Sequence, residues 1–566
     1  MTSNNRTNMD KNTQTRLTEL LEVLYEPSVA AATLPRLIAT LAAPIAHEPR
    51  NDSMLVSYGD SVCSEDQAPL ETLHQFIGKY LGDACGRLHL LPFFPSSSDD
   101  GFAVIDYRMV DHHLGGWDDI AALARDYDLM FDLVINHCSR ENLWFADFIN
   151  HREPGRNFFI TLPEEVDTSM VARPRSTPLI SPVHTYGGIR HVWNTFSADQ
   201  IDLDFTNPDV LVEFVEILSF YAARGARLVR LDAVGYLWKR LGTTCLNLPE
   251  THVVVKILRV LAEQLCPSLR LITETNVPHE ENVAYFGDGD EAHLVYQFSL
   301  APLLLYSFVF GDGSYLRQWA AQLDEPPEGT TYLNFIASHD GIGLRPLEGL
   351  MPEAEVDRLV DKMHARGGFV TLREVSAHEQ KPYEINISLL SAFGGEPGLD
   401  AFLAAHALLL SFQGSPALYI HSLLGTLNDL DLVEQTGRTR SINRRKWQLP
   451  ELEARLQVAE SLEARTLAGM THLLTQRNAQ PALQATADQR ILPAPKGVFL
   501  LQRECREQSL LVVCSLMDQP QILPVDMLQV TAGIYVDRLH EQSIAITTGL
   551  PLQPHQVMWL ELPAGA

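Results

Sequence analysis

Short apolar segments alternate with amphipathic helical segments over most of the chain, from about residue 52 to residue 425. Five of the apolar segments are apolar at their start and polar or charged at their end: Leu88–Pro95, Leu129–His137, Leu228–Tyr236, Arg270–Asn276 and Tyr332–Asp340. This alternation is typical of a parallel β/α fold. Because the carboxyl ends of the strands form the active-site face of a β/α barrel, polar strand ends collect there. We therefore expect a parallel β/α barrel with its chemistry at the mouth.

The helices between these strands have recognisable boundaries. One begins with Asn207 as its N-cap and Pro208 in its first turn, and it ends near Gly225. Its apolar side chains recur at helical spacing and form one face: Val210, Phe214, Ile217 and Tyr221. A second helix is expected from about residue 250 to residue 265. Both helices fit the outer layer of a barrel.

The pattern divides the chain into three parts. Residues 1–50 carry leucines at helical spacing and are expected to form an N-terminal helical extension. Residues 51–484 are expected to form the catalytic β/α barrel, and residues 485–566 alternate like a small antiparallel β domain. Two stretches rich in Pro, Gly and charge interrupt the barrel at about 139–196 and 341–398. Each stretch follows a strand end, so both should overhang the mouth.

Composition excludes several classes of partner. The formal net charge of −28 would repel a phosphodiester backbone, so we expect no nucleic-acid partner. The seven cysteines lack metal-binding or redox spacing. Residues 1–15 are polar and lack the apolar core of a secretory signal, so we expect a cytoplasmic protein. The strongest apolar run, Phe298–Phe310, is too short to span a bilayer, and no membrane association is expected.

Two strand-end carboxylates suit the chemistry of glycosidic bonds. Arg230 and Asp232 lie two residues apart on one strand, so their side chains leave the same face, and the guanidinium favours the ionised carboxylate. Glu274 ends the following strand. Because neighbouring strands lie about 4.8 Å apart, the two carboxyl groups can approach the roughly 5 Å separation of retaining glycosidases. The spacing thus favours a double displacement.

A single carboxylate at a strand end is more often a helix cap or an ion-pair partner than a catalytic group. Here a third carboxylate, Asp340, closes another apolar strand. Side chains that can donate hydrogen bonds to sugar hydroxyls accompany the three acids: Arg230, His137 and His339. Three acids that face one mouth indicate a functional site.

Four segments resemble, in order and spacing, the signature regions of the α-amylase superfamily: DLVINH (Asp132–His137), VRLDAVGYLWK (Val229–Lys239), ITETN (Ile272–Asn276) and ASHDGIG (Ala337–Gly343). Within the superfamily the chain is most similar to the sucrose phosphorylase group, and in particular to its glucosylglycerate phosphorylase members, over nearly its whole length. This second resemblance is carried by LLPFFPSSSDDGFAVIDY (Leu90–Tyr107), RPRSTPL (Arg173–Leu179), ITETNVPHEENVAYFGDGDEAHLVYQFSL (Ile272–Leu300) and RSINRRKW (Arg440–Trp447). It implies an eight-stranded barrel of the TIM type.

The resemblance also implies a role for each matching residue. Asp232 would be the nucleophile, Glu274 the acid/base, and Asp340 the carboxylate that orients sugar hydroxyls and stabilises the transition state. The other residues implied at the same glucose subsite are Arg230, His137 and His339. The resemblance further pairs Asp99 with Arg444 as a clamp on the far hydroxyls of glucose, over an apolar platform made by Phe102. From spacing alone, a buried ion pair and a core aromatic are equally good interpretations.

Phosphate is the second substrate of the resembling group, and its matching positions here are Arg175 and Tyr236. An arginine in a surface insertion is usually a solvated charge, but the stiff Arg173–Pro174–Arg175 sequence would help to hold a guanidinium toward an oxyanion. The resemblance gives Gln200 a contact with the acceptor or with phosphate. It implies no metal, and because the sequence carries no nucleotide or flavin fingerprint we expect no organic cofactor.

One position departs from the sucrose-specific members of the group, which carry histidine where Asn276 stands. The departure favours the glucosylglycerate type, with reversible phosphorolysis of 2-O-α-glucosylglycerate to α-glucose 1-phosphate and glycerate through a covalent glucosyl-enzyme. Arg345 and Lys381 in the second insertion are candidate contacts for the acceptor carboxylate, although such loops carry charge for solubility as well. The alternatives are a sucrose phosphorylase, an α-glucoside hydrolase, or a non-catalytic carbohydrate-binding barrel.

Overall fold

Eight parallel strands close into a barrel at the centre of the molecule. The computed structural model describes residues 9–175, 177–376 and 379–563. In order around the barrel the strands are β1 (Met54–Ser57), β17 (Ser415–Tyr419), β13 (Thr331–Asn334), β12 (Leu294–Tyr296), β11 (Arg270–Thr273), β10 (Ala226–Asp232), β4 (Asp128–Val134) and β3 (Arg87–Leu90). The predicted barrel is confirmed, and all five segments with polar ends contribute a strand.

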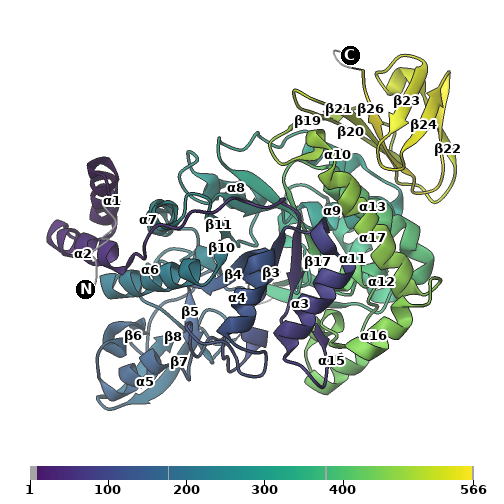
Figure 1. The fold of residues 1–566 in the computed structure, drawn as a ribbon. Coiled ribbons are helices and arrows are strands. Elements are labelled where there is room, and N and C mark those ends of the chain that lie inside the picture. Colours follow the sequence, from purple (N-terminus) through teal and green to yellow (C-terminus); the bar gives the residue numbers. More distant parts are fainter. Residues whose placement is uncertain (1–8, 176, 377–378, 564–566) are drawn as a thin grey trace.

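Helices surround the barrel (Figure 1). The main ones are α3 (Pro69–Tyr80), α4 (Trp117–Asp126), α6 (Pro208–Ala223), α7 (Pro249–Leu265), α9 (Leu300–Phe310), α13 (Leu399–Ser411) and α17 (Leu462–Asn478). The side chain of Asn207 accepts a hydrogen bond from the backbone N–H of Asp209 at 3.0 Å, so α6 has the N-cap that its sequence predicts. Val210, Phe214, Ile217 and Tyr221 are all fully buried, as expected for the face that packs on the strands.

The two insertions form small structures of their own beyond the strand ends. The first contains α5 (Leu143–Asn150), β6 (Thr161–Leu162), β7 (Ile180–Thr185) and β8 (Gly188–Trp193). The second contains β14 (Ile342–Gly343), the short helix η6 (Arg345–Leu347), α11 (Glu353–Ala365), β15 (Phe369–Ser376) and β16 (Glu379–Asn386). Strands β14 and β15 pair with β16 on either side, giving a three-stranded antiparallel sheet.

Both ends of the described chain pack on the barrel. Helices α1 (Lys11–Leu24) and α2 (Pro27–Thr40) lie beside α7 and α6 (Figure 1), and the Tyr25 hydroxyl donates to the Phe205 carbonyl at 3.0 Å. At the other end, six antiparallel strands form a sheet in the order β19 (Asp488–Leu492), β20 (Val498–Glu504), β21 (Ser509–Ser515), β26 (Val557–Glu561), β23 (Gly533–Asp537) and β24 (Gln542–Ile546). Trp559 in this sheet donates to the Ser411 hydroxyl of α13 at 2.9 Å.

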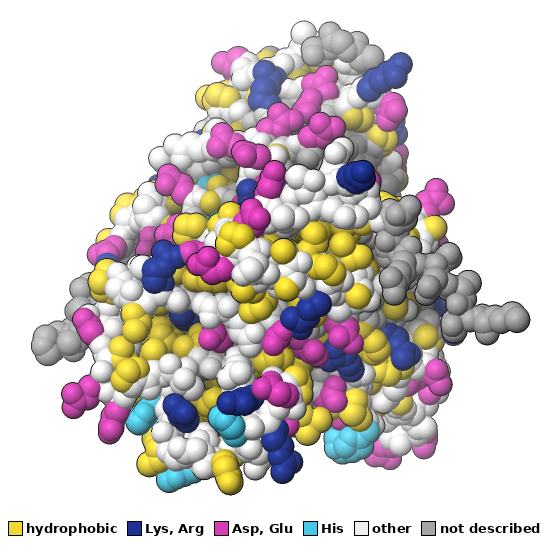
Figure 2. Space-filling view, turned by 90° about the vertical axis from the view of Figure 1, so that its left-hand side faces the viewer, with side chains coloured by type: hydrophobic (Ala, Val, Ile, Leu, Met, Phe, Trp, Pro, Cys, Tyr) yellow, Lys and Arg dark blue, Asp and Glu magenta, His cyan; other side chains and the backbone are white. Residues whose placement is uncertain are grey.

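Surface charge is dispersed. Figure 2 shows acidic and basic side chains scattered among apolar ones over one face, rather than separated by sign. Across the described residues, every helix is too short or too polar to cross a membrane.

Candidate active site

A pocket at the carboxyl ends of the barrel strands brings the three predicted carboxylates together. Asp232 is the last residue of β10, Glu274 follows β11 directly, and Asp340 lies between β13 and β14. All three line the pocket. Strands β10 and β11 are hydrogen-bonded neighbours, with Leu231 opposite Thr273 in register. The first two carboxylates are therefore held on adjacent strands, as the sequence predicts.

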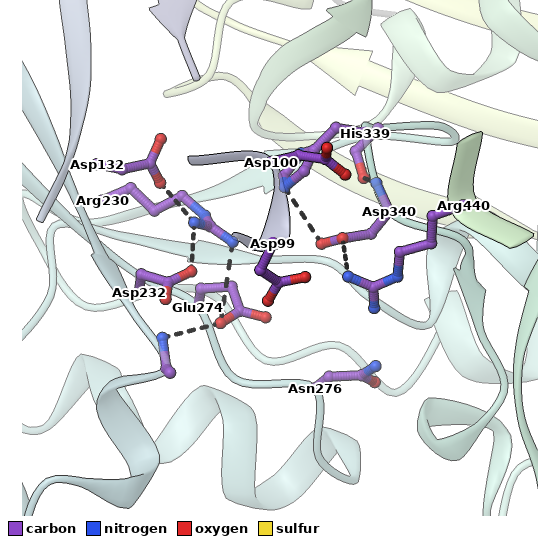
Figure 3. A network of polar contacts seen from close by, with 12 residues as sticks. Asp99, Asp100, Asp132, Arg230, Asp232, Glu274, Asn276, His339, Asp340 and Arg440 are labelled. Carbon is purple, nitrogen blue, oxygen red and sulfur yellow. Dashed lines mark hydrogen bonds and ion pairs between the residues drawn. The ribbon is translucent and has the colours of Figure 1, made fainter. Parts of the chain in front are cut away.

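Arg230 links Asp232 and Glu274 (Figure 3). Its Nη1 atom donates to Asp232 at 2.7 Å and to Asp132, while its Nη2 atom lies 3.9 Å from Glu274. Glu274 also accepts a hydrogen bond from the backbone N–H of Ala233 at 3.1 Å. Ala233 has a φ of 54°, in the left-handed region that is unfavourable for an L-residue. The chain thus adopts a strained conformation directly after Asp232, and this conformation directs an N–H group at Glu274.

Burial sets the electrostatics of this pair. It raises the pKa of Asp232 and of Glu274 above their ordinary values, although Arg230 opposes the shift at both. Asp132 differs, because His89 and Arg230 outweigh its burial and lower its pKa to about 2. The sequence led us to expect that Arg230 would favour ionised Asp232. The guanidinium is in place, but it also pairs with Asp132, and neighbouring Glu274 and Asp340 add negative charge. The pocket therefore holds a proton on the Asp232–Glu274 pair more tightly than an exposed carboxyl would.

Asp340 stands in the opposite electrostatic environment. Burial acts to raise its pKa, but Arg440, His339 and Arg444 outweigh burial and hold the pKa well below the ordinary value. The Nη1 atom of Arg440 donates to Asp340 at 2.6 Å (Figure 3). Asp340 is therefore a fixed anion at the pocket wall.

An aromatic and histidine layer forms another side of the pocket. The rings of Phe102 and His339 stack with centroids 5.3 Å apart, and the guanidinium of Arg230 lies over the Phe102 ring at 5.6 Å. His137 approaches the Phe102 carbonyl through Nε2 at 3.0 Å and the Gln200 amide at 3.1 Å. These four predicted residues and Gln200 all line the pocket.

The buried ammonium group of Lys239 is linked to His137 through the side chain of Asn136. The Nζ atom of Lys239 contacts Asp202 and Asn136, each at 2.7 Å, and Asn136 also donates to Asp202 at 3.0 Å. The oxygen of Asn136 thus accepts from Lys239. Among the described residues, one group of three could share a metal ion: Asp111, His112 and His113, on the surface.

The predicted phosphate residues lie on one side of the same pocket. The Nη2 atom of Arg175 is 3.3 Å from Asp99, and its guanidinium lies over the Phe196 ring at 5.9 Å. Tyr236 packs edge-on against Phe196, with the two ring centroids 5.4 Å apart. Arg175 and Tyr236 thus flank Phe196, and all three line the pocket.

Among the described residues Asp99 and Arg444 contact different partners rather than each other, and the clamp on glucose that the resemblance implies for this pair stays a prediction. Arg444 pairs with Asp100 and donates from Nε to the His339 carbonyl at 2.8 Å, while Asp99 accepts from Gln200 at 3.1 Å. The reason is local: Asp99 and Asp100 both have positive φ, at 55° and 51°, so a tight turn sends the two side chains in different directions. Arg444 supports Asp340 from outside the residues that line the pocket.

Sequence reasoning missed three pocket residues that the second insertion and the segment after β17 contribute. Arg440 donates to both carboxylate oxygens of buried Glu384, at 3.0 and 2.6 Å, while it holds Asp340. Tyr383 receives a hydrogen bond from the Asn276 amide at 3.4 Å. The only sequence signal for these residues was the cluster of arginines in RSINRRKW, which does not show which carboxylates each arginine contacts.

Comparison with known proteins agrees with the geometry. The catalytic-domain family of α-amylase matches residues 80–327. Glucosylglycerate phosphorylase of Spirochaeta thermophila is 42% identical over 88% of this chain and 88% of its own length, and that of Escherichia coli is 41% identical over 82% and 85%. The chain belongs to the α-amylase superfamily. Within the superfamily it belongs to the glycoside phosphorylases of the sucrose phosphorylase group.

Other members of this superfamily show the same architecture. Sucrose phosphorylase of Streptococcus mutans is 29% identical over 81% of this chain and 94% of its own length. The crystal structure of sucrose 6F-phosphate phosphorylase from Thermoanaerobacter thermosaccharolyticum superimposes with a TM-score of 0.73 at 27% identity, covering 83% of this chain and 95% of that one. The fold of this chain is thus shared with that phosphorylase over most of both chains.

Proposed function

We propose that the enzyme is a retaining glycoside phosphorylase that reversibly converts 2-O-α-glucosylglycerate and phosphate into α-glucose 1-phosphate and glycerate. The observation that carries the reaction type is the pair Asp232 and Glu274, which adjacent strands hold in one pocket around Arg230. The choice of acceptor is supported by Asn276 and by the glucosylglycerate phosphorylases at 41–43% identity.

In the first step Asp232 attacks the anomeric carbon, the bond to glycerate breaks, and Glu274 gives its proton to the departing glycerate oxygen. This assignment of the proton rests on distance. Arg230 contacts Asp232 at 2.7 Å but lies 3.9 Å from Glu274, so the ionised form is the better stabilised one at Asp232. Burial raises the pKa of Glu274, which suits a general acid.

In the second step a phosphate oxygen attacks the anomeric carbon, the ester bond to Asp232 breaks, and Glu274 takes up the proton that the nucleophile loses. The configuration at the anomeric carbon is retained, because two displacements invert it twice. Asp340 remains anionic and stabilises the positive charge that develops on the sugar ring in the transition state of each step. His137, His339, Asp99 and Phe102 surround the same sugar.

Phosphate must compete with water, which is present at about 55 M, for the glucosyl-enzyme. Positioned charge gives phosphate its advantage, and we assign this role to Arg175 with help from the Tyr236 hydroxyl and the Gln200 amide. Asp99 contacts one nitrogen atom of the Arg175 guanidinium at 3.3 Å. This long contact leaves the remaining donors of Arg175 for an incoming oxyanion.

The test of this function supplies α-glucose 1-phosphate together with glycerate, fructose, glycerol or water in separate reactions and measures the release of phosphate. We expect release to be fastest with glycerate. Fastest release with fructose would indicate a sucrose phosphorylase, and equal release with water alone would indicate a hydrolase. No release with any acceptor would leave a carbohydrate-binding barrel as the remaining interpretation.

A further inference from the structure

The pocket carries more acidic groups than basic ones, and its arginines already have partners. Its lining carboxylates are Asp99, Asp232, Glu274, Asp340 and Glu384, and its lining cations are Arg175, Arg230 and Arg440. Arg230 contacts Asp232, Arg440 bridges Asp340 and Glu384, and Arg175 contacts Asp99. An anion that enters this pocket as an acceptor would therefore be stabilised by a further cation next to the wall.

Arg345 lies just outside the pocket lining, next to the part of the wall that Asn276 and Tyr383 form. It follows β14 by two residues, at the start of η6. A Cβ atom built on Gly343 would lie 3.0 Å from the Asn276 side chain, so the backbone of β14 covers Asn276 closely. The next residue, Leu344, donates its N–H to the Tyr383 carbonyl at 2.9 Å. Arg345 is thus held beside Asn276 and Tyr383, which both line the pocket.

The charge of Arg345 acts on the pocket. Burial and Tyr383 raise the pKa of the Tyr236 hydroxyl, and among the cations Arg345 opposes this shift most strongly, ahead of Arg373. Since Tyr236 lines the pocket, the charge of Arg345 acts on the pocket wall, and the backbone contact of Leu344 with Tyr383 holds Arg345 beside that wall.

Arg345 also differs from Arg373 and Lys381, two other cations of its insertion, in having no ion pair with a described residue. Arg373 pairs with Glu348 and Lys381 pairs with Glu353, whereas Arg345 makes no ion pair or side-chain hydrogen bond with any described residue. The Nε atom of Arg345 is buried and lacks an acceptor. The Oδ1 atom of Asn276 is likewise buried and lacks a donor. Burying a donor without a partner costs free energy, so such groups usually bind a ligand or a water molecule.

We propose that Arg345 binds the carboxylate of the acceptor and sets the preference of the enzyme for anionic over neutral acceptors. The proposal rests on the proposed function and adds to it the residue that recognises the acceptor. A guanidinium can donate two parallel hydrogen bonds to a carboxylate, and the neutral amide of Asn276 beside it can contact the acceptor hydroxyls without competing for its charge. A neutral acceptor such as glycerol would leave the guanidinium unpaired.

The experiment compares kcat/KM for glycerate with kcat/KM for glycerol, with α-glucose 1-phosphate as donor, in wild-type enzyme, Arg345→Gln, Arg345→Lys and Arg373→Gln. Both acceptors attack the same glucosyl-enzyme, so any effect on its formation cancels from the ratio. We expect Arg345→Gln to lower the ratio by about tenfold to hundredfold, as for the loss of a charge-assisted contact, and Arg345→Lys to lower it less. Arg373→Gln is the matched control, because its paired guanidinium should leave the ratio within about twofold of wild type.

A ratio that changes less than threefold in Arg345→Gln would overturn the proposal, and so would an equal fall in Arg373→Gln. If Arg345→Gln does not fold, Arg345→Lys decides, because an unchanged ratio there overturns the proposal and a threefold or greater fall supports it. The wild-type ratio separately tests the proposed function: a preference for glycerol or fructose over glycerate contradicts that function. A wild-type preference for another small hydroxy acid contradicts the choice of glycerate alone, and Arg345 is then tested with that acid in the same ratio.

Discussion

Arg230 holds Asp132 and Asp232 through a single nitrogen atom, and the remaining contacts of Asp232 are few. We predict that Asp232→Asn lowers phosphate release from α-glucose 1-phosphate by at least about a thousandfold, because an amide cannot form the glucosyl ester. The asparagine keeps the size of the side chain, so circular dichroism and the thermal midpoint should stay close to wild type. Turnover near that of wild type in a pure preparation would exclude Asp232 as the nucleophile.

The raised pKa of Glu274 predicts a particular pH profile. Glu274 must be protonated to release glycerate, so kcat/KM for glucosylglycerate should fall as pH rises through its pKa, which burial places above the ordinary 4.5. The profile of Glu274→Gln with α-glucosyl fluoride, whose leaving group needs no proton, should lack this basic limb. A limb that persists unchanged in Glu274→Gln would mean that another group titrates there.

Arg175 gives a prediction about product choice. Removing its positioned charge in Arg175→Ala should raise the phosphate concentration needed for half-maximal rate by at least about tenfold, since charge-assisted contacts contribute roughly 1.5–3 kcal/mol. The products should shift from α-glucose 1-phosphate toward free glucose. The measurement is the ratio of these two products at fixed phosphate, and an unchanged ratio would make Arg175 a solvated charge.

At the scale of elements, β16 is held against the pocket by Glu384, which pairs with Arg440. Gly341 makes this close approach possible, because a Cβ atom there would lie 2.6 Å from the Ile385 carbonyl and would overlap Glu384. We predict that Gly341→Ala displaces β16 and lowers kcat/KM by at least about tenfold, with Arg440 and Asp340 losing their alignment. Gly78→Ala in α3, where a Cβ atom meets nothing within 4 Å, is the control and should keep full activity. Equal activities of the two variants would contradict this account.

The strands and the presence of two insertions were predictable from sequence, but the contacts that the second insertion makes in the pocket were not. A strand shows a local pattern, apolar residues followed by polar ones, and a period of two fixes that Arg230 and Asp232 share a face. The contacts of Arg440 join residues that are 56 and 100 positions apart, so no local pattern reveals them. The choice between Asp99 and Asp100 as the partner of Arg444 depends on two left-handed residues, which the sequence SSSDDG does not distinguish.

At the scale of the whole molecule, several buried histidines predict sensitivity to mild acid. Burial lowers the pKa of four of them to about 3 or about 4: His293, His339, His406 and His421. The unfolded chain binds protons at these positions near pH 6.5 and the folded enzyme does not, so the free energy of unfolding falls as pH drops below 6.5. His540, whose pKa Asp537 raises, acts in the opposite sense for one proton.

We predict that the midpoint of urea unfolding falls steadily between pH 7 and pH 5. Each extra proton bound by the unfolded chain contributes about 1.4 kcal/mol per pH unit. His406→Gln removes one such group and should make the dependence less steep by about that amount, measured by urea titration at several pH values. A midpoint that stays constant over this range in wild-type enzyme would show that the folded state takes up the same protons.

The adjacent strands β10 and β11 fix Asp232 and Glu274 through backbone hydrogen bonds, whereas Arg175, Tyr383 and Arg345 belong to insertions outside the barrel. The two carboxylates of the proposed displacement are therefore encoded apart from Arg175, Tyr383 and Arg345. A mutational library of codons 139–196 and 341–398 that keeps Gly341 and Glu384 unchanged should alter the preference for acceptor or phosphate more often than it abolishes glucosyl transfer. The same separation would let natural drift diversify acceptors within one lineage while Asp232 and Glu274 stay unchanged.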